Sequence, residues 1–195
     1  MLLAAGEGSR LGRPKALVEL GGQTLAERGA GLLLAGGADP VLVVAGAARI
    51  ELDQARVVYN EYWRTGMGSS LRAALQALTE AEAGDQDDVG AVVVALADQP
   101  LVGAEAVARL IAAYRAGASV AVAAYQGRPR NPVLLAREHW PEVMAAATGD
   151  QGARAFLRAR PDLVTLVECG DTGRPDDIDT ADDLDRIARR YRDPR

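Results

Sequence analysis

The chain has 195 residues, with 22 Lys and Arg against 27 Asp and Glu, and a formal net charge of -5. This length suits one domain over residues 1–195 with its own apolar core. The acidic balance gives no general footprint for nucleic acid or for an anionic membrane surface. A single cysteine and a single histidine exclude an internal disulfide and supply too few ligands for a zinc site. This cysteine usage makes the cytoplasm the expected location. No apolar run is long enough to span a bilayer.

Apolar segments rich in Val and Ala alternate with segments of helical period, which predicts βαβ units around a mainly parallel sheet. The elements expected in chain order are a strand at 2–5, a loop at 6–14, a helix at 24–37, strands at 41–46 and 56–60, a helix at 67–77, an acidic loop at 83–88, a strand at 91–98, a helix at 104–117, strands at 119–125 and 132–135, helices at 137–147 and 151–160, a strand at 162–169 and a helix at 180–192. Ser69 or Ser70 is the expected N-cap of the helix at 67–77, and Thr180 that of the last helix. Ligands bind at the carboxyl ends of the strands in such sheets, so the first loop and the turns at Asn60 and Asp98 are expected to emerge at one edge.

The stretch LLAAGEGSRLGRPK at 2–15 suggests a phosphate-binding loop directly after the first strand. Its glycines let the backbone approach a ligand closely, and its three cations supply charge. Gly6, Gly8 and Gly12 also fit a dinucleotide spacing, G-x-G-x-x-x-G. Pro14, however, falls where the helix should begin, and the next strand does not end in the acidic residue that would hold a ribose. No Gly-Lys-Ser/Thr follows at P-loop spacing, and a solvated surface turn is the remaining alternative.

Aspartates follow two later segments, and phosphoryl transfer needs oxygen ligands for a hard divalent cation. Asp98 directly follows the run VVVALA, where a charge is costly unless it has a partner. We therefore interpret it as a metal ligand rather than as a cap of the following turn. In RPDDIDT, alternation places Asp177 and Asp179 on one face of a short strand, with an acidic cap as the alternative. Asp182 and Asp183 fit the first turn of the last helix, where the helix dipole favours acids.

Several stretches together resemble the MobA-like NTP transferase superfamily, and they occur in family order: LAAGEGSRLGRPK, N-x-x-W-x-x-G-M-G-S-S-L, LADQP, GDQGAR and DIDT. Members of this superfamily move a nucleoside monophosphate from an NTP to a phosphate. The resemblance implies an α/β fold of the nucleotidyltransferase type, three-layered and Rossmann-like with a mainly parallel sheet. The Leu-Ala-Ala-Gly start and the Asp-Gln-Pro are most similar to the branch of molybdenum cofactor cytidylyltransferases, which implies CTP as substrate.

The resemblance also implies a role for each matching residue. Asp98 and Asp179 would hold Mg²⁺ or Mn²⁺, and catalysis would rest on Lys15, Arg10 and Asp98. The residues expected to contact the nucleotide are Leu3, Ala4, Ala5, Gly6, Gly8, Ser9, Arg10, Lys15, Asn60, Gly66, Met67, Gly68 and Ser69. For the aromatic pair beside them, Tyr62 and Trp63, ordinary core packing is the alternative.

The acceptor is implied less directly, because the chain departs from the branch at this point. Where the branch has Gly-His-Pro before its PVLF strand, this chain has RNPVLL at 130–135. Arg128, Arg130 and Arg154 suit an anionic acceptor such as a pterin phosphate, or they are solvated surface charges. The segment at 149–152 either lines the acceptor site or provides a cap for the next helix through Asp150.

Other functions stay open from the sequence. They are a transferase for another acceptor such as a sugar phosphate, an NAD(P)-dependent oxidoreductase, and a binding protein for a molybdenum enzyme. If the chain is a molybdenum cofactor cytidylyltransferase, a molybdenum hydroxylase is a candidate protein partner. His139 has no expected catalytic role.

Overall fold

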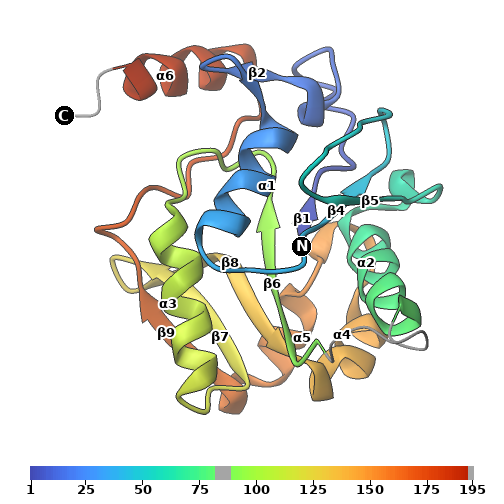
Figure 1. The fold of residues 1–195 in the computed structure, drawn as a ribbon, viewed down its shortest axis with the longest axis vertical. Helices are drawn as coiled ribbons and strands as arrows, with labels where there is room; N and C mark the ends of the chain where they lie inside the picture. The colour runs from blue at the N-terminus through green and yellow to red at the C-terminus, as the bar shows by residue number, and fades with distance from the viewer. Residues whose placement is uncertain (82–88, 193–195) are drawn as a thin grey trace.

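The computed structural model describes residues 1–81 and 89–192 as an α/β fold around a mixed, mainly parallel sheet. Its seven strands, in order across the sheet, are β5 (Arg56–Tyr59), β4 (Leu42–Ala45), β1 (Leu2–Leu3), β6 (Ala91–Leu96), β8 (Arg128–Ala136), β7 (Val120–Tyr125) and β9 (Val164–Glu168). β8 runs antiparallel to both of its neighbours, and the other pairs are parallel. β1 and β6 lie side by side, so the segments that follow them emerge together at one edge (Figure 1).

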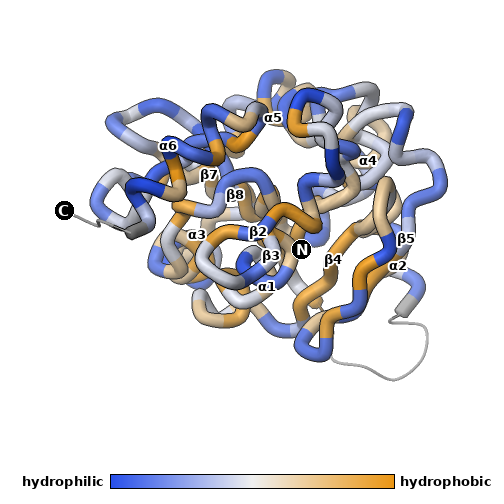
Figure 2. The backbone as a smooth tube through the Cα atoms, turned by 90° about the horizontal axis from the view of Figure 1, so that it is seen from above, coloured by the Kyte–Doolittle hydropathy of each residue, from blue (hydrophilic) through white to orange (hydrophobic). Residues whose placement is uncertain are grey.

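Helices cover both faces of the sheet and give the expected three layers. One apolar core includes residues of α1 (Leu25–Ala35), α3 (Ala104–Arg115) and α6 (Ala181–Arg192). A second core includes residues of α2 (Met67–Ala81), α4 (Trp140–Ala146) and α5 (Arg154–Ala159). Strands covered on both sides are apolar throughout, as β4 is, and hydrophobic colour follows it in Figure 2. The predicted fold class is therefore confirmed.

Two helices begin with the same reciprocal cap. At α1, the Thr24 hydroxyl accepts from the Glu27 amide and the Glu27 carboxylate accepts from the Thr24 amide. At α6, Thr180 and Asp183 make the equivalent pair of bonds. Such caps satisfy amides that have no partner within the helix, which explains why both helices begin where the sequence predicts.

Short 3-10 turns account for several boundaries that the sequence does not predict. They are η1 (Lys15–Leu17), η2 (Trp63–Thr65), η4 (Arg137–His139), η5 (Gly149–Gln151) and η6 (Pro161–Leu163). The helix expected at 151–160 is shorter in the structure. The 3-10 turn η5 extends to Gln151, and α5 covers only Arg154–Ala159. The N-cap predicted at Ser69 or Ser70 is wrong, since α2 already begins at Met67 and both serines lie inside its first turn.

Two strand predictions need correction, and one pair of strands was missed. A hairpin of β2 (Glu19–Leu20) and β3 (Gln23–Thr24) was not predicted. β8 is longer than the segment expected at 132–135. The segment with Asp177 and Asp179 carries no strand. The acidic loop expected at 83–88 lies outside the described residues.

Among the residues that the structure describes, no helix combines the length and the apolar character needed to cross a membrane.

Candidate active site

A cleft of about 980 Å³ opens at the carboxyl ends of β1 and β6. Most residues predicted to bind nucleotide or metal line it: Leu3, Ala4, Ala5, Gly6, Gly8, Ser9, Arg10, Lys15, Gly66, Met67, Asp98 and Asp179. These residues come from four separate stretches of the chain. Their meeting in one cleft agrees with the expectation that ligands bind at this edge of the sheet.

The glycine-rich loop between β1 and η1 folds back on itself. The Lys15 amide donates to the Gly6 carbonyl oxygen at 3.2 Å, and the Leu11 amide donates to the Gly8 carbonyl oxygen at 2.8 Å. The loop then enters the short η1 and the β2–β3 hairpin before α1 begins. A dinucleotide fingerprint would lead directly into a long helix whose N-terminus faces the pyrophosphate, so this geometry disfavours that reading.

Lys15 lies between two carboxylates at the floor of the cleft. Its Nζ donates to Asp98 Oδ2 at 2.7 Å and to Asp179 Oδ1 at 2.5 Å. Burial lowers the pKa of Lys15, but the charges and hydrogen bonds of both aspartates outweigh burial, and the net pKa is raised above its ordinary value. Lys15 is therefore a fixed positive charge over the physiological pH range.

The backbone around Asp179 explains why this aspartate, and not Asp177, reaches Lys15. Ile178 is fully buried, and its amide donates to the Asp98 carbonyl oxygen at 2.8 Å. On the other side, the Asp177 carboxylate accepts from Gln99 Nε2 at 2.8 Å. Asp177 is thus engaged by the turn after β6, while Asp179 points to the cleft.

The donor set suits a hard divalent cation. Two carboxylates converge on one cation, the Lys15 ammonium, and they face a cleft large enough for a nucleotide. No cluster of three or more candidate ligating side chains occurs within residues 1–81 and 89–192. Mg²⁺ typically binds through one or two carboxylates, with water and substrate phosphates completing its shell. Asp98 and Asp179 fit that pattern.

Three predicted nucleotide contacts do not line the cleft but lie behind it. Asn60 is buried, and its Nδ2 donates to Ser69 Oγ at 2.8 Å and to Ser70 Oγ at 3.0 Å. Its Oδ1 accepts from the Tyr62 amide at 2.9 Å. Gly68 is buried against the backbone of residues 147 and 148. These residues shape the loop that presents Gly66 and Met67.

The opposite wall comes from η5 and α5. Asp150 and Arg154 both line the cleft, whereas the cap suggested for Asp150 is not formed. Arg128 and Arg130 are exposed at the start of β8 and are not among the lining residues. His139 contacts Ser119 at 2.9 Å and also lies outside the lining, as expected.

Sequence reasoning missed part of the cleft wall. Trp63 and Arg64 line it, with the Arg64 guanidinium 4.3 Å from the Trp63 ring centre. The other lining residues that were not predicted are Glu7, Ser70, Leu96 and Ala97. These residues could have been found from their place in the sequence, because each is adjacent to or within a few residues of a predicted one.

The family description "MobA-like NTP transferase domain" matches residues 1–164. "Nicotine blue oxidoreductase" of Paenarthrobacter nicotinovorans is 38% identical over 201 residues, covering 96% of this chain and 94% of that protein.

Two solved structures extend the comparison. The Rv0371c homologue from Mycobacterium sp. strain JC1 has a TM-score of 0.84 at 30% identity, covering 100% of this chain and 96% of that chain. A structure of Rv0371C from Mycobacterium tuberculosis H37Rv, described as a complex with manganese, has a TM-score of 0.75 at 25% identity, covering 96% of each chain.

Proposed function

Because this chain belongs to the MobA-like NTP transferase family, we propose that it transfers CMP from CTP to the phosphate of the molybdopterin cofactor and releases pyrophosphate. The observation that carries the proposal is the convergence of Lys15, Asp98 and Asp179 beside the glycine-rich loop in one cleft. The proposal treats residues 1–195 as one catalytic domain.

The reaction needs no protein nucleophile. An oxygen of the acceptor phosphate attacks the α-phosphorus of CTP, and the bond from that phosphorus to the bridging oxygen breaks as pyrophosphate leaves. Asp98 and Asp179 would hold Mg²⁺ or Mn²⁺, which supplies positive charge to the phosphates. Lys15 and Arg10 neutralise the charge that develops on pyrophosphate, and the loop backbone aligns the nucleotide. Catalysis is thus positioning together with electrostatic stabilisation.

Selection of CTP is proposed from the Leu-Ala-Ala-Gly start of the loop. Leu3, Ala4 and Ala5 line the cleft where the chain leaves β1. The acceptor proposal is supported by Arg154, which lines the opposite wall and offers a cation to a phosphate. Arg128 and Arg130 lie elsewhere and are not part of the proposed acceptor site.

The test is pyrophosphate release with Mg²⁺ and CTP, GTP, UTP or ATP, each with and without the reduced molybdopterin cofactor. We expect release only when CTP and the cofactor are both present. Release with a sugar phosphate in place of the pterin would keep the transferase chemistry and replace the acceptor. No release with any pair would contradict the proposal.

A second candidate, an NAD(P)-dependent oxidoreductase, is favoured by one observation, the 38% identity to nicotine blue oxidoreductase. It is separated from the first by measuring NADPH binding without a divalent cation and NADPH consumption with nicotine blue. Tight binding and consumption, together with absent pyrophosphate release, would select the oxidoreductase.

A further inference from the structure

The Lys15 ammonium contacts the same two carboxylates that the proposed function assigns to the metal ion. Lys15 is less exposed than either partner side chain, at 18% against 21% for Asp98 and 46% for Asp179. Among the residues that the structure describes, no other side chain donates to either carboxylate. The single positive charge of Lys15 is therefore shared by both acids, in the position that the proposed function gives to a divalent ion.

The two demands on Lys15 conflict. Its proposed role in the reaction is to bind the departing pyrophosphate, yet its three donors are here directed in part to Asp98 and Asp179. An ammonium and a metal ion that use the same carboxylate oxygens repel each other strongly in a partly buried site. A metal ion that takes these oxygens must therefore displace the Lys15 ammonium, and a phosphate can then accept it.

We propose that Lys15 is the resident cation of the metal site, and that it competes with the divalent ion for Asp98 and Asp179 until a triphosphate draws it away. This inference rests on the proposed function and concerns the order in which ligands bind. Without nucleotide, the lysine compensates part of the charge of both acids. A divalent ion alone then binds weakly, and an ion that arrives with nucleotide binds well because the phosphates offer Lys15 a new partner.

The backbone supports this exchange of partners. The Lys15 amide is fixed to the Gly6 carbonyl oxygen, so the base of the side chain stays beside the loop that approaches the phosphates. The side chain is a flexible four-carbon stem that ends in a compact ammonium group. Lys15 can thus move its ammonium between acids and phosphate without refolding the loop.

The test is Mn²⁺ binding to the full chain, measured by electron paramagnetic resonance with and without α,β-methylene-CTP, which is not turned over. In Lys15→Met the competitor is gone, so Mn²⁺ without nucleotide should bind about tenfold more tightly than to wild type. With the analogue bound, wild type should bind Mn²⁺ more tightly than Lys15→Met, because the variant lacks the lysine contact to phosphate. A difference in Mn²⁺ affinity that changes sign when the analogue is added is expected only if Lys15 exchanges the carboxylates for phosphate.

Two control variants separate the explanations. Arg13→Met removes the same charge from the same loop, but Arg13 is exposed and does not line the cleft, so Mn²⁺ affinity should stay close to that of wild type. Asp98→Asn should lose Mn²⁺ binding. Circular dichroism of each variant checks that the fold is retained.

The outcomes are distinct. Equal Mn²⁺ affinity in wild type and Lys15→Met, with binding lost in Asp98→Asn, overturns the competition and leaves the metal site in place. An equal gain in Mn²⁺ affinity in Arg13→Met and Lys15→Met also overturns it, because the loss of any positive charge from the loop would then explain the gain. Unchanged binding in Asp98→Asn removes the metal assignment and the inference together.

Discussion

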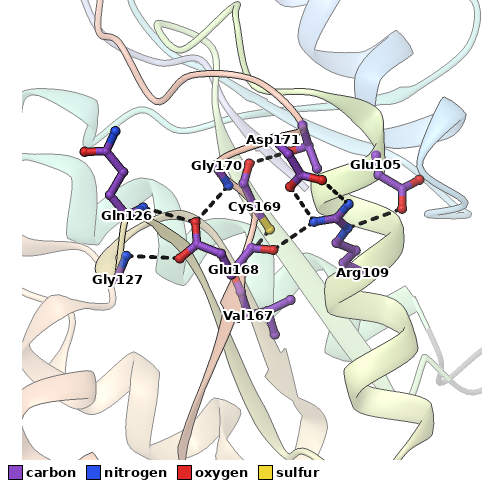
Figure 3. A network of polar contacts seen from close by, with 10 residues as sticks. Glu105, Arg109, Gln126, Gly127, Val167, Glu168, Cys169, Gly170 and Asp171 are labelled. Atoms are coloured by element: carbon purple, nitrogen blue, oxygen red, sulfur yellow. Dashed lines mark hydrogen bonds and ion pairs between the residues drawn. The ribbon is translucent and has the colours of Figure 1, made fainter.

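Two regions at the carboxyl edge of the sheet each gather a cation and acidic groups, but they do so differently. In the first, the Lys15 ammonium is shared between two aspartates. In the second, Arg109 of α3 forms a two-pronged pair with Asp171, at 2.7 and 2.8 Å, and also donates to the Glu168 carbonyl oxygen (Figure 3).

The second region is saturated with partners. The Glu168 carboxylate accepts from the amides of Gln126, Gly127 and Gly170 at 2.9–3.0 Å, which ties the β7–β8 turn to the end of β9 (Figure 3). Those bonds lower the pKa of Glu168. No residue of this network lines the cleft. The contrast teaches that a fully partnered network holds elements together, whereas acids that share one cation beside a cleft can exchange it for a ligand.

The largest expected effect is on the rate of pyrophosphate release, which should depend on the acids of the first region and not on those of the second. Asp98→Asn should reduce pyrophosphate release about a hundred- to a thousandfold, because a ligand of the metal ion that stabilises charge on the reacting phosphates is lost. Asp171→Asn changes an acid of the second region and should leave the rate unchanged. Steady-state kinetics on both variants is the measurement, and equal loss in the two would contradict the contrast.

A matched pair of glycine substitutions tests how tightly each region is packed. Gly66 and Gly127 both have positive φ, at 106° and 73°. A Cβ at Gly66 would collide with the Gly149 backbone, whereas one at Gly127 would meet no atom of the described residues within 4 Å. Gly127→Ala should cost about 1 kcal/mol from conformation alone.

Gly66→Ala should cost more, about 1–3 kcal/mol for its conformation, with the collision added. It should also weaken nucleotide binding, because Gly66 lines the cleft. Urea unfolding and nucleotide titration measure the two effects. Equal stability losses at the two positions would show that the close approach to Gly149 carries no weight.

A pH series tests the saturated network through Glu168. Three amide donors lower its pKa, so its contribution to the free energy of unfolding is complete above its ordinary pKa. The contribution is lost as the pH falls through the lowered value, where the folded carboxylate is protonated. Glu168→Gln should lower the urea midpoint slightly at neutral pH, and the difference from wild type should shrink in acid. A difference independent of pH would contradict this.

The smallest effect concerns Asp183, which holds the backbone next to the first region. Its contacts with Arg186 and Thr180 lower its pKa from 3.8 to about 2. Its contribution to stability is therefore complete above its ordinary pKa and declines as the pH falls toward 2. Asp183→Asn should reduce the Tm slightly at pH 7 and converge with wild type near pH 2. Calorimetry at several pH values is the check.

Periodicity was enough to predict most of the layered fold. β1, β4, β6, α1, α3 and α6 lie where apolar patterns and caps place them. The strand at 132–135 was expected beside the strand at 119–125, and β8 does pair with β7. Its pairing with β6 and its antiparallel direction could not be predicted, because apolar alternation does not specify the partner or direction of a strand. β8 is also longer than the segment expected at 132–135. The β2–β3 hairpin has strands of two residues each, too short for a periodic signal.

The cleft shows a similar division. The adjacency of Asp98 and Asp179 was expected from strand ends and from the family resemblance. The place of Lys15 between them was not, because a cation beside a glycine-rich loop was interpreted only as a phosphate contact. Asn60 lies behind the lining for a related reason, since the sequence does not show whether a loop amide faces a ligand or the supporting serines.

The close approach of segment 66–68 to segment 147–152 also bears on when the cleft forms during folding. Gly66 meets Gly149, and Gly68 meets Ala147, across the whole middle of the chain. Such a long closure costs chain entropy before any contact repays it. On refolding, we therefore expect the far-UV signal of the helices, whose hydrogen bonds are local, to recover ahead of nucleotide binding. A partly folded chain would then hold its helices without a nucleotide site.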